Sequence, residues 1–125
     1  MQRNLTSSRF VITGVAGALG QNLALNLGKR GAHIIGFDKD KAELKALEKK
    51  FLQEKISAQL SALDITNAKA VEKAIRPLTK APLTGLILNA GITRISFFEE
   101  QKDADFERVF AVNFFAATRM ARLLL

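Results

Sequence analysis

Residues 10–20 read Phe10-Val-Ile-Thr-Gly-Val-Ala-Gly-Ala-Leu-Gly20, an apolar run that passes directly into a glycine-rich turn. A helical pattern of leucines and small residues follows the turn. Gly14, Gly17 and Gly20 allow the backbone to turn tightly and to approach a ligand closely. The start of the following helix presents free N–H groups and the positive end of its dipole. The stretch therefore predicts a strand, a turn and a helix that together can hold a pyrophosphate.

Short apolar runs alternate with longer helical patterns along the rest of the chain. Continuous apolar strands separated by helices are typical of a parallel sheet that is covered on both faces. Because crossovers are right-handed, we expect the strand order 3-2-1-4, which is half of a Rossmann-like, doubly wound α/β fold. The predicted strands are 10–13, 33–37, 56–63 (near a sheet edge) and 84–90; the predicted helices are 18–30, 40–54, 67–76 and 103–125, with a loop over 91–102.

The composition excludes several classes of function. The 125 residues contain no cysteine, so no disulfide or thiolate chemistry is available, and no Asp/Glu/His cluster has metal-ligand spacing. The net charge is +7, but the basic residues are spread along the chain and the densest group lies on the helix over 40–54, which indicates a solvated face rather than a nucleic-acid site.

The single histidine, His33, begins a strand and is expected to be structural. No apolar run is long enough to span a bilayer and the N-terminus lacks an apolar signal core, so we expect a soluble, cytoplasmic protein without a membrane partner.

Two carboxylates follow predicted strands. Asp38 ends the second strand, where a carboxylate can accept hydrogen bonds from an adenosine ribose. Asp64 ends the third strand, where it can meet an adenine edge. Asp38 could instead cap the following helix, and Asp64 could be a cap or turn residue. Together with the glycine turn, the pair favours a dinucleotide site.

These residues, with two further motifs, resemble the short-chain dehydrogenase/reductase family over essentially the whole chain. The glycine motif fits a variant form with glycines at positions two, five and eight, because Ala18 stands where the common form has glycine. Leu88-Asn89-Ala90-Gly91 resembles the family's Asn-Asn-Ala-Gly, and Leu63-Asp64-Ile65 resembles its element beside the adenine. Val112-Asn113 matches the position of the tetrad asparagine. The resemblance implies that residues 1–125 are the N-terminal half of an NAD(P)-binding Rossmann domain.

The resemblance implies a nicotinamide cofactor and hydride transfer to or from a carbonyl/alcohol substrate. An acid at the position of Asp38 usually goes with NAD(H), since it repels the 2′-phosphate of NADP(H); Lys39 follows directly and moderates this preference, so NADP remains the less favoured cofactor. The substrate is not identified, because the family builds its pocket mostly from later residues. The implied cofactor-binding residues are Gly14, Gly17, Leu19, Gly20, Asp38, Asp64, Ile65, Asn89, Ala90 and Gly91.

Catalytic residues are nearly absent from this chain. Relatives use a serine and a Tyr-x-x-x-Lys pair that follow the asparagine helix, whereas this sequence has nine phenylalanines and no tyrosine. Asn113 is the only tetrad member present, and a polar helix residue satisfied by the neighbouring strand is the favoured alternative for it. We therefore expect a cofactor-binding half that does not turn over alone. A non-catalytic dinucleotide-binding or self-assembling module is the alternative.

The last predicted helix is apolar around much of its circumference and ends on Leu123-Leu124-Leu125. Natural termini are usually polar and exposed, so this end predicts a truncated domain. Without a following strand, the strand over 84–90 is left at an edge of the sheet. In relatives the corresponding helix packs against a second subunit. The sequence thus predicts a homo-oligomer formed through the fourth strand and the last helix.

Overall fold

A four-stranded parallel sheet forms the centre of the computed structural model, which describes residues 4–125. The strands lie in the order β3-β2-β1-β4, so the predicted fold class and strand order are confirmed. In the register of the sheet, Val11 of β1 lies between Ile35 of β2 and Leu86 of β4. The strands are β1 (Arg9–Thr13), β2 (His33–Asp38), β3 (Ala58–Ala62) and β4 (Gly85–Leu88).

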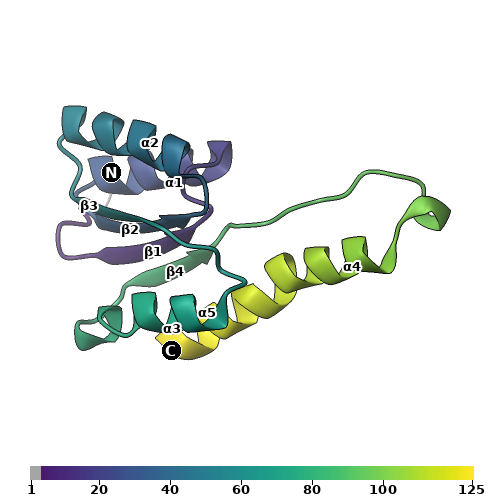
Figure 1. The fold of residues 1–125 in the computed structure, drawn as a ribbon. Coiled ribbons are helices and arrows are strands. Elements are labelled where there is room, and N and C mark those ends of the chain that lie inside the picture. The colour runs from purple at the N-terminus through teal and green to yellow at the C-terminus, as the bar shows by residue number, and fades with distance from the viewer. Residues whose placement is uncertain (1–3) are drawn as a thin grey trace.

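Helices cover both faces of the sheet. Figure 1 shows α1 (Ala18–Lys29) and α2 (Lys41–Gln53) on one side, and α3 (Ala68–Ile75) and α5 (Ala117–Leu124) on the other. Asn67 caps α3 by accepting a hydrogen bond from Ala70 N, and the helix ends before Pro77 as predicted. No helix among residues 4–125 has the length and apolar character needed to cross a bilayer.

The core consists of two apolar clusters, one on each face. Adjacent residues of a strand point to opposite faces, so Val11 packs with Met120 under α3 and α5, while Ile12 packs with Leu47 under α1 and α2. All four side chains are at most 2% exposed. Burial on both faces explains why the central strands read as continuous apolar runs rather than as alternating ones.

Two strands are shorter than predicted. β3 covers Ala58–Ala62 rather than 56–63. It lies at an edge of the sheet, as expected, and pairs only with β2 among the described strands. β4 ends at Leu88 rather than at Ala90. The Asn89 side chain bonds to the turn after β1, and Ala90 N bonds to the Thr13 hydroxyl at the end of β1 instead of extending the ladder.

The last helix differs from the prediction in its middle. An uninterrupted α-helix over 103–125 was predicted, but α4 (Asp103–Phe110) and α5 are joined by a π-helical segment, η3 (Ala111–Ala116). Asn113 lies in this segment, and both ends of its amide bond to the backbone of Ile92 in the preceding loop. The π-helical turns therefore coincide with the hydrogen bonds that attach this part of the helix to the loop after β4. Such π-segments inside α-helices are frequent at functional sites. α4 continues from the π-segment away from the sheet, and the loop over 91–102 extends outward with it, including the short turn η2 (Phe98–Glu100) (Figure 1).

Candidate functional site

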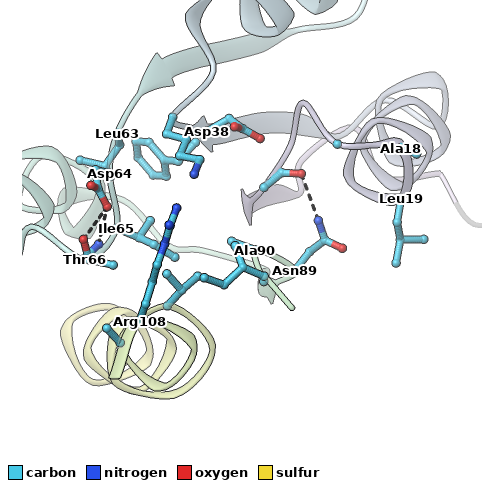
Figure 2. A pocket seen from close by; sticks show the side chains of 18 residues that line it. Ala18, Leu19, Asp38, Leu63, Asp64, Ile65, Thr66, Asn89, Ala90 and Arg108 are labelled. Atoms are coloured by element: carbon cyan, nitrogen blue, oxygen red, sulfur yellow. Dashed lines mark hydrogen bonds between the residues drawn. The ribbon is translucent and has the colours of Figure 1, made fainter. Parts of the chain in front are cut away.

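A cleft of about 510 Å³ opens at the carboxyl ends of the strands. β1 and β4 are neighbours in the sheet, and the chain passes from β1 to α1 on one face and from β4 toward α5 on the other (Figure 1). This change of face makes the carboxyl ends of β1 and β4 the switch point of the sheet. The loops after all four strands and one face of the last helix contribute to it, as the close view in Figure 2 shows. The cleft is lined by Gly14, Gly17, Ala18, Leu19, Phe37, Asp38, Lys39, Leu63, Asp64, Ile65, Thr66, Asn89, Ala90, Gly91, Ile92, Arg108, Ala111 and Val112.

The glycine turn forms one wall of the cleft. Gly14 has φ +64°, and a Cβ on it would lie 2.9 Å from the Ala90 Cα, so neither the conformation nor the space admits a side chain. A Cβ on Gly17 would meet only the Gly14 carbonyl at 3.5 Å, so its backbone is open to the cleft. α1 begins directly afterwards without a side-chain cap. Its first N–H groups are therefore available to an anion in the cleft.

Gly20 lies behind the turn rather than in the cleft. It does not line the cleft, and a Cβ on it would overlap the Gly14 carbonyl oxygen and lie 2.9 Å from the Val15 Cα. Its missing side chain allows α1 to pack against its own preceding turn. Of the three glycines in the predicted turn motif, the structure therefore places Gly14 and Gly17 at the cleft and Gly20 in support of them.

Asp38 ties the end of β2 to the glycine turn. Its Oδ2 accepts a hydrogen bond from Ala16 N at 3.0 Å, and its Oδ1 accepts one from Asp40 N at 3.1 Å. Asp40 is the residue that caps α2, accepting from Ala42 N and Glu43 N. The alternative of Asp38 as a helix cap is therefore wrong, because the cap lies two residues later. Asp38 instead lines the cleft as a half-buried carboxylate beside the turn.

Asp64 combines a turn with a place in the cleft. Its Oδ1 accepts hydrogen bonds from the Thr66 hydroxyl at 2.7 Å and from Thr66 N at 2.9 Å. These two bonds hold the pKa of the Asp64 carboxyl below its usual value. The turn alternative thus describes the local bonding of Oδ1, and Asp64 also lines the cleft, where the sequence predicts a binding role. Ile65, also predicted, is buried in the cleft wall.

The end of β4 is bonded to the same turn. Asn89 Nδ2 donates to Gly14 O at 3.0 Å and to Thr13 O at 3.2 Å, one of which is drawn in Figure 2. Ala90 N donates to the hydroxyl of Thr13, a buried side chain. Asn89, Ala90 and Gly91 therefore bring β4 into the cleft and hold the turn after β1 in place.

Asn113 lies outside the lining of the cleft. Its Oδ1 accepts from Ile92 N at 2.9 Å, and its Nδ2 donates to Ile92 O at 2.8 Å. This is close to the structural alternative, except that the backbone partner lies in the loop after β4 rather than in the strand itself. A catalytic role for Asn113 stays a prediction.

Sequence reasoning missed Arg108. Its side chain extends from α4 into the cleft, toward the side where Leu63 and Ile65 lie (Figure 2). Ala111 and Val112, three and four residues later, line the cleft with it, as neighbours on one helix face do. The four-residue spacing between Arg108 and Val112 puts both on one face of the helix and was the signal available in the sequence. It indicates the cleft only when the position of the helix relative to β4 is known.

Comparison with known proteins agrees with this geometry. Residues 9–125 match the family described as short chain dehydrogenase. The chain belongs to the short-chain dehydrogenase family. Over 114 residues it is 37% identical to the 5-keto-D-gluconate 5-reductase of Escherichia coli strain K12, covering 88% of this chain and 44% of that protein.

Two solved structures share the fold of this chain. An NAD+-bound xylitol dehydrogenase superposes with a TM-score of 0.90 at 22% identity, covering 98% of this chain and 48% of that one. A metagenomic short-chain oxidoreductase in complex with NADP gives 0.89 at 24% identity, covering 97% and 56%. The present chain spans about half the length of the relatives it matches.

Proposed function

We propose that this chain is the cofactor-binding half of an NAD(P)-dependent oxidoreductase that transfers hydride between nicotinamide and a carbonyl/alcohol substrate. The observation that carries the proposal is the turn after β1, where Gly14 packs on Ala90 and Gly17 stands open at the start of α1. These residues fit a dinucleotide: the start of α1 takes the pyrophosphate, and Asp38 takes the adenosine ribose. The nicotinamide itself supplies the hydride acceptor or donor when bound.

The chain's own residues bind and orient the dinucleotide without completing its chemistry. Leu63, Ile65 and Val112 give the cleft an apolar section for an adenine ring. Proton transfer to a carbonyl oxygen needs a positioned acid, which the family resemblance assigns to a tyrosine, and these 125 residues contain none. We expect nucleotide binding without turnover from this chain. A non-catalytic dinucleotide-binding module is the second candidate, and the presence or absence of a serine and a Tyr-x-x-x-Lys in the coding sequence after Leu125 distinguishes the two.

NADH is expected to bind more tightly than NADPH, by about tenfold, because Asp38 lines the cleft at the end of β2, where a carboxylate accepts hydrogen bonds from ribose hydroxyls and repels a 2′-phosphate. Fluorescence titration with each reduced cofactor tests this directly, and the chain has no tryptophan or tyrosine to interfere with the signal. The matched control is Lys39→Ala, which removes the neighbouring cleft cation and should widen the preference. Equal affinities, or tighter binding of NADPH, contradict the assignment of Asp38.

Self-association through β4 and the last helix is part of the same proposal. Phe110, Phe114 and Phe115 are each more than half exposed on α4 and η3, and β4 pairs with β1 alone among the described strands. Light scattering is expected to give a dimer or larger species at micromolar concentration, and Phe114→Glu is expected to reduce it to a single chain, because a charge cannot be buried there without a partner. Lys45→Glu on the exposed side of α2 is the control. A wild-type protein that elutes as a clean monomer refutes this part of the proposal.

A further inference from the structure

We infer that Arg108 binds the adenine of the dinucleotide by laying its guanidinium plane on the face of the ring. The inference rests on the proposed function and adds a residue to the same cleft. The guanidinium group is planar and weakly hydrated, and it stacks readily on aromatic rings, including nucleobases.

The position of Arg108 is the first support. Its side chain rises from α4 into the cleft and approaches the wall formed after β3, where Leu63, Asp64 and Ile65 lie (Figure 2). It makes no hydrogen bond or ion pair with any other residue of the range 4–125, whereas Arg94, on the loop before α4, pairs with Asp105 at 3.8 Å. A cation that spans a cleft without a protein partner is available to a ligand.

The wall formed after β3 has the chemistry for a purine. Leu63 and Ile65 are each only 8% exposed and present an apolar surface to the cleft, as a flat ring requires. Asp64 lies between them in sequence, and its Oδ1 is occupied by the two donors of Thr66. Its Oδ2 accepts no hydrogen bond from the described residues, so it can accept one from an exocyclic amino group. An apolar wall, a free acceptor at its edge and a planar cation across from it together suit adenine.

The same guanidinium could instead pair with a 2′-phosphate at the ribose end. Two observations favour the adenine. Asp38 occupies the ribose end, and its carboxylate repels a phosphate there. Among the described residues, Arg108 also forms no ion pair with Asp38, whose two carboxylate oxygens accept hydrogen bonds from Ala16 N and Asp40 N. The position of the guanidinium group is therefore not set by attraction to the Asp38 carboxylate.

The test compares two ligands that share adenine and differ at the 2′-position, 5′-AMP and adenosine 2′,5′-bisphosphate, by calorimetry on the whole protein. Arg108→Ala is expected to weaken both by a similar factor, about tenfold, as for the loss of one stacking partner of a base. Arg108→Lys is expected to behave like the alanine variant, because lysine keeps the charge but has no plane. Arg122→Ala, which removes an exposed arginine in the last turn of α5, should change neither affinity. Urea unfolding of each variant checks that the fold is unchanged.

The outcomes separate this inference from the proposed function. If Arg108→Ala weakens only the bisphosphate and lysine restores it, Arg108 is a phosphate-binding residue and the inference is wrong. If the wild type binds 5′-AMP and Arg108→Ala binds it equally well, the inference also fails, while the proposed function stands. If the wild type binds neither nucleotide, nor NADH, the proposed function fails and the inference fails with it.

Discussion

Gly20→Ala is expected to lower the free energy of unfolding by about 3 kcal/mol and to remove measurable NADH binding. The added methyl group would overlap the Gly14 carbonyl oxygen and press on the Val15 Cα, and both are backbone atoms that cannot rotate away. α1 would have to move off the turn that precedes it. The same movement displaces the N–H groups proposed to hold the pyrophosphate. Urea denaturation followed by circular dichroism, with NADH titration on the folded fraction, measures both effects.

Gly17→Ala is the matched control, because it places the same methyl group three residues earlier, at the N-cap of α1. Its Cβ would meet only the Gly14 carbonyl at an ordinary 3.5 Å, and its φ of −71° is open to any residue, so we expect a stability loss below about 1 kcal/mol. NADH affinity should nevertheless fall about tenfold or more, since the methyl group occupies the space that the backbone leaves for the ligand. A Gly20→Ala protein as stable as the wild type contradicts the packing argument. Full NADH affinity in Gly17→Ala means that the pyrophosphate binds elsewhere.

Asp38→Ala is expected to lower the free energy of unfolding by about 2 kcal/mol, because two backbone N–H groups lose their acceptor at once. One is that of Ala16 in the glycine turn, which is largely buried, and the other is that of Asp40. NADH affinity should fall by more than tenfold through the lost ribose contact and the loosened turn, and NADPH affinity should fall less because the repulsive charge is gone. Asp38→Asn keeps an acceptor oxygen, so it should retain more stability while still losing the preference for NADH.

Asp40→Ala separates the effect on the site from the effect on stability. Asp40 caps α2 through two N–H groups and does not line the cleft, so its loss should destabilise the protein by about 1 kcal/mol. Affinities for NADH and NADPH should stay at their wild-type values. If Asp40→Ala weakens NADH as much as Asp38→Ala does, the contribution of Asp38 is general stability rather than ribose binding.

Most of the fold follows from local patterns in the sequence. The apolar runs at 10–13 and 33–37, with a helical pattern between them, favour a parallel sheet covered on both faces, and the right-handed crossover then sets the strand order. The middle of the last helix could not be predicted in the same way. Its π-segment coincides with hydrogen bonds between Asn113 and Ile92, which lie far apart in the chain and are brought together only by the loop after β4.

The sequence by itself determined the class of fold, the glycine turn and the placing of Asp38 and Asp64 at strand ends, because periodicity and turn chemistry are properties of neighbouring residues. Only the tertiary structure decided what each of these residues does there. In the structure, Gly17 faces the cleft, whereas Gly20 supports the turn. Asp40 caps α2, and Asp38 bonds the end of β2 to the glycine turn. The tertiary structure also places Arg108 at the cleft. These roles depend on which backbone atoms come within a few ångströms when the loops after β1, β2 and β4 meet at one edge of the sheet, and spacing along the chain does not specify such distances.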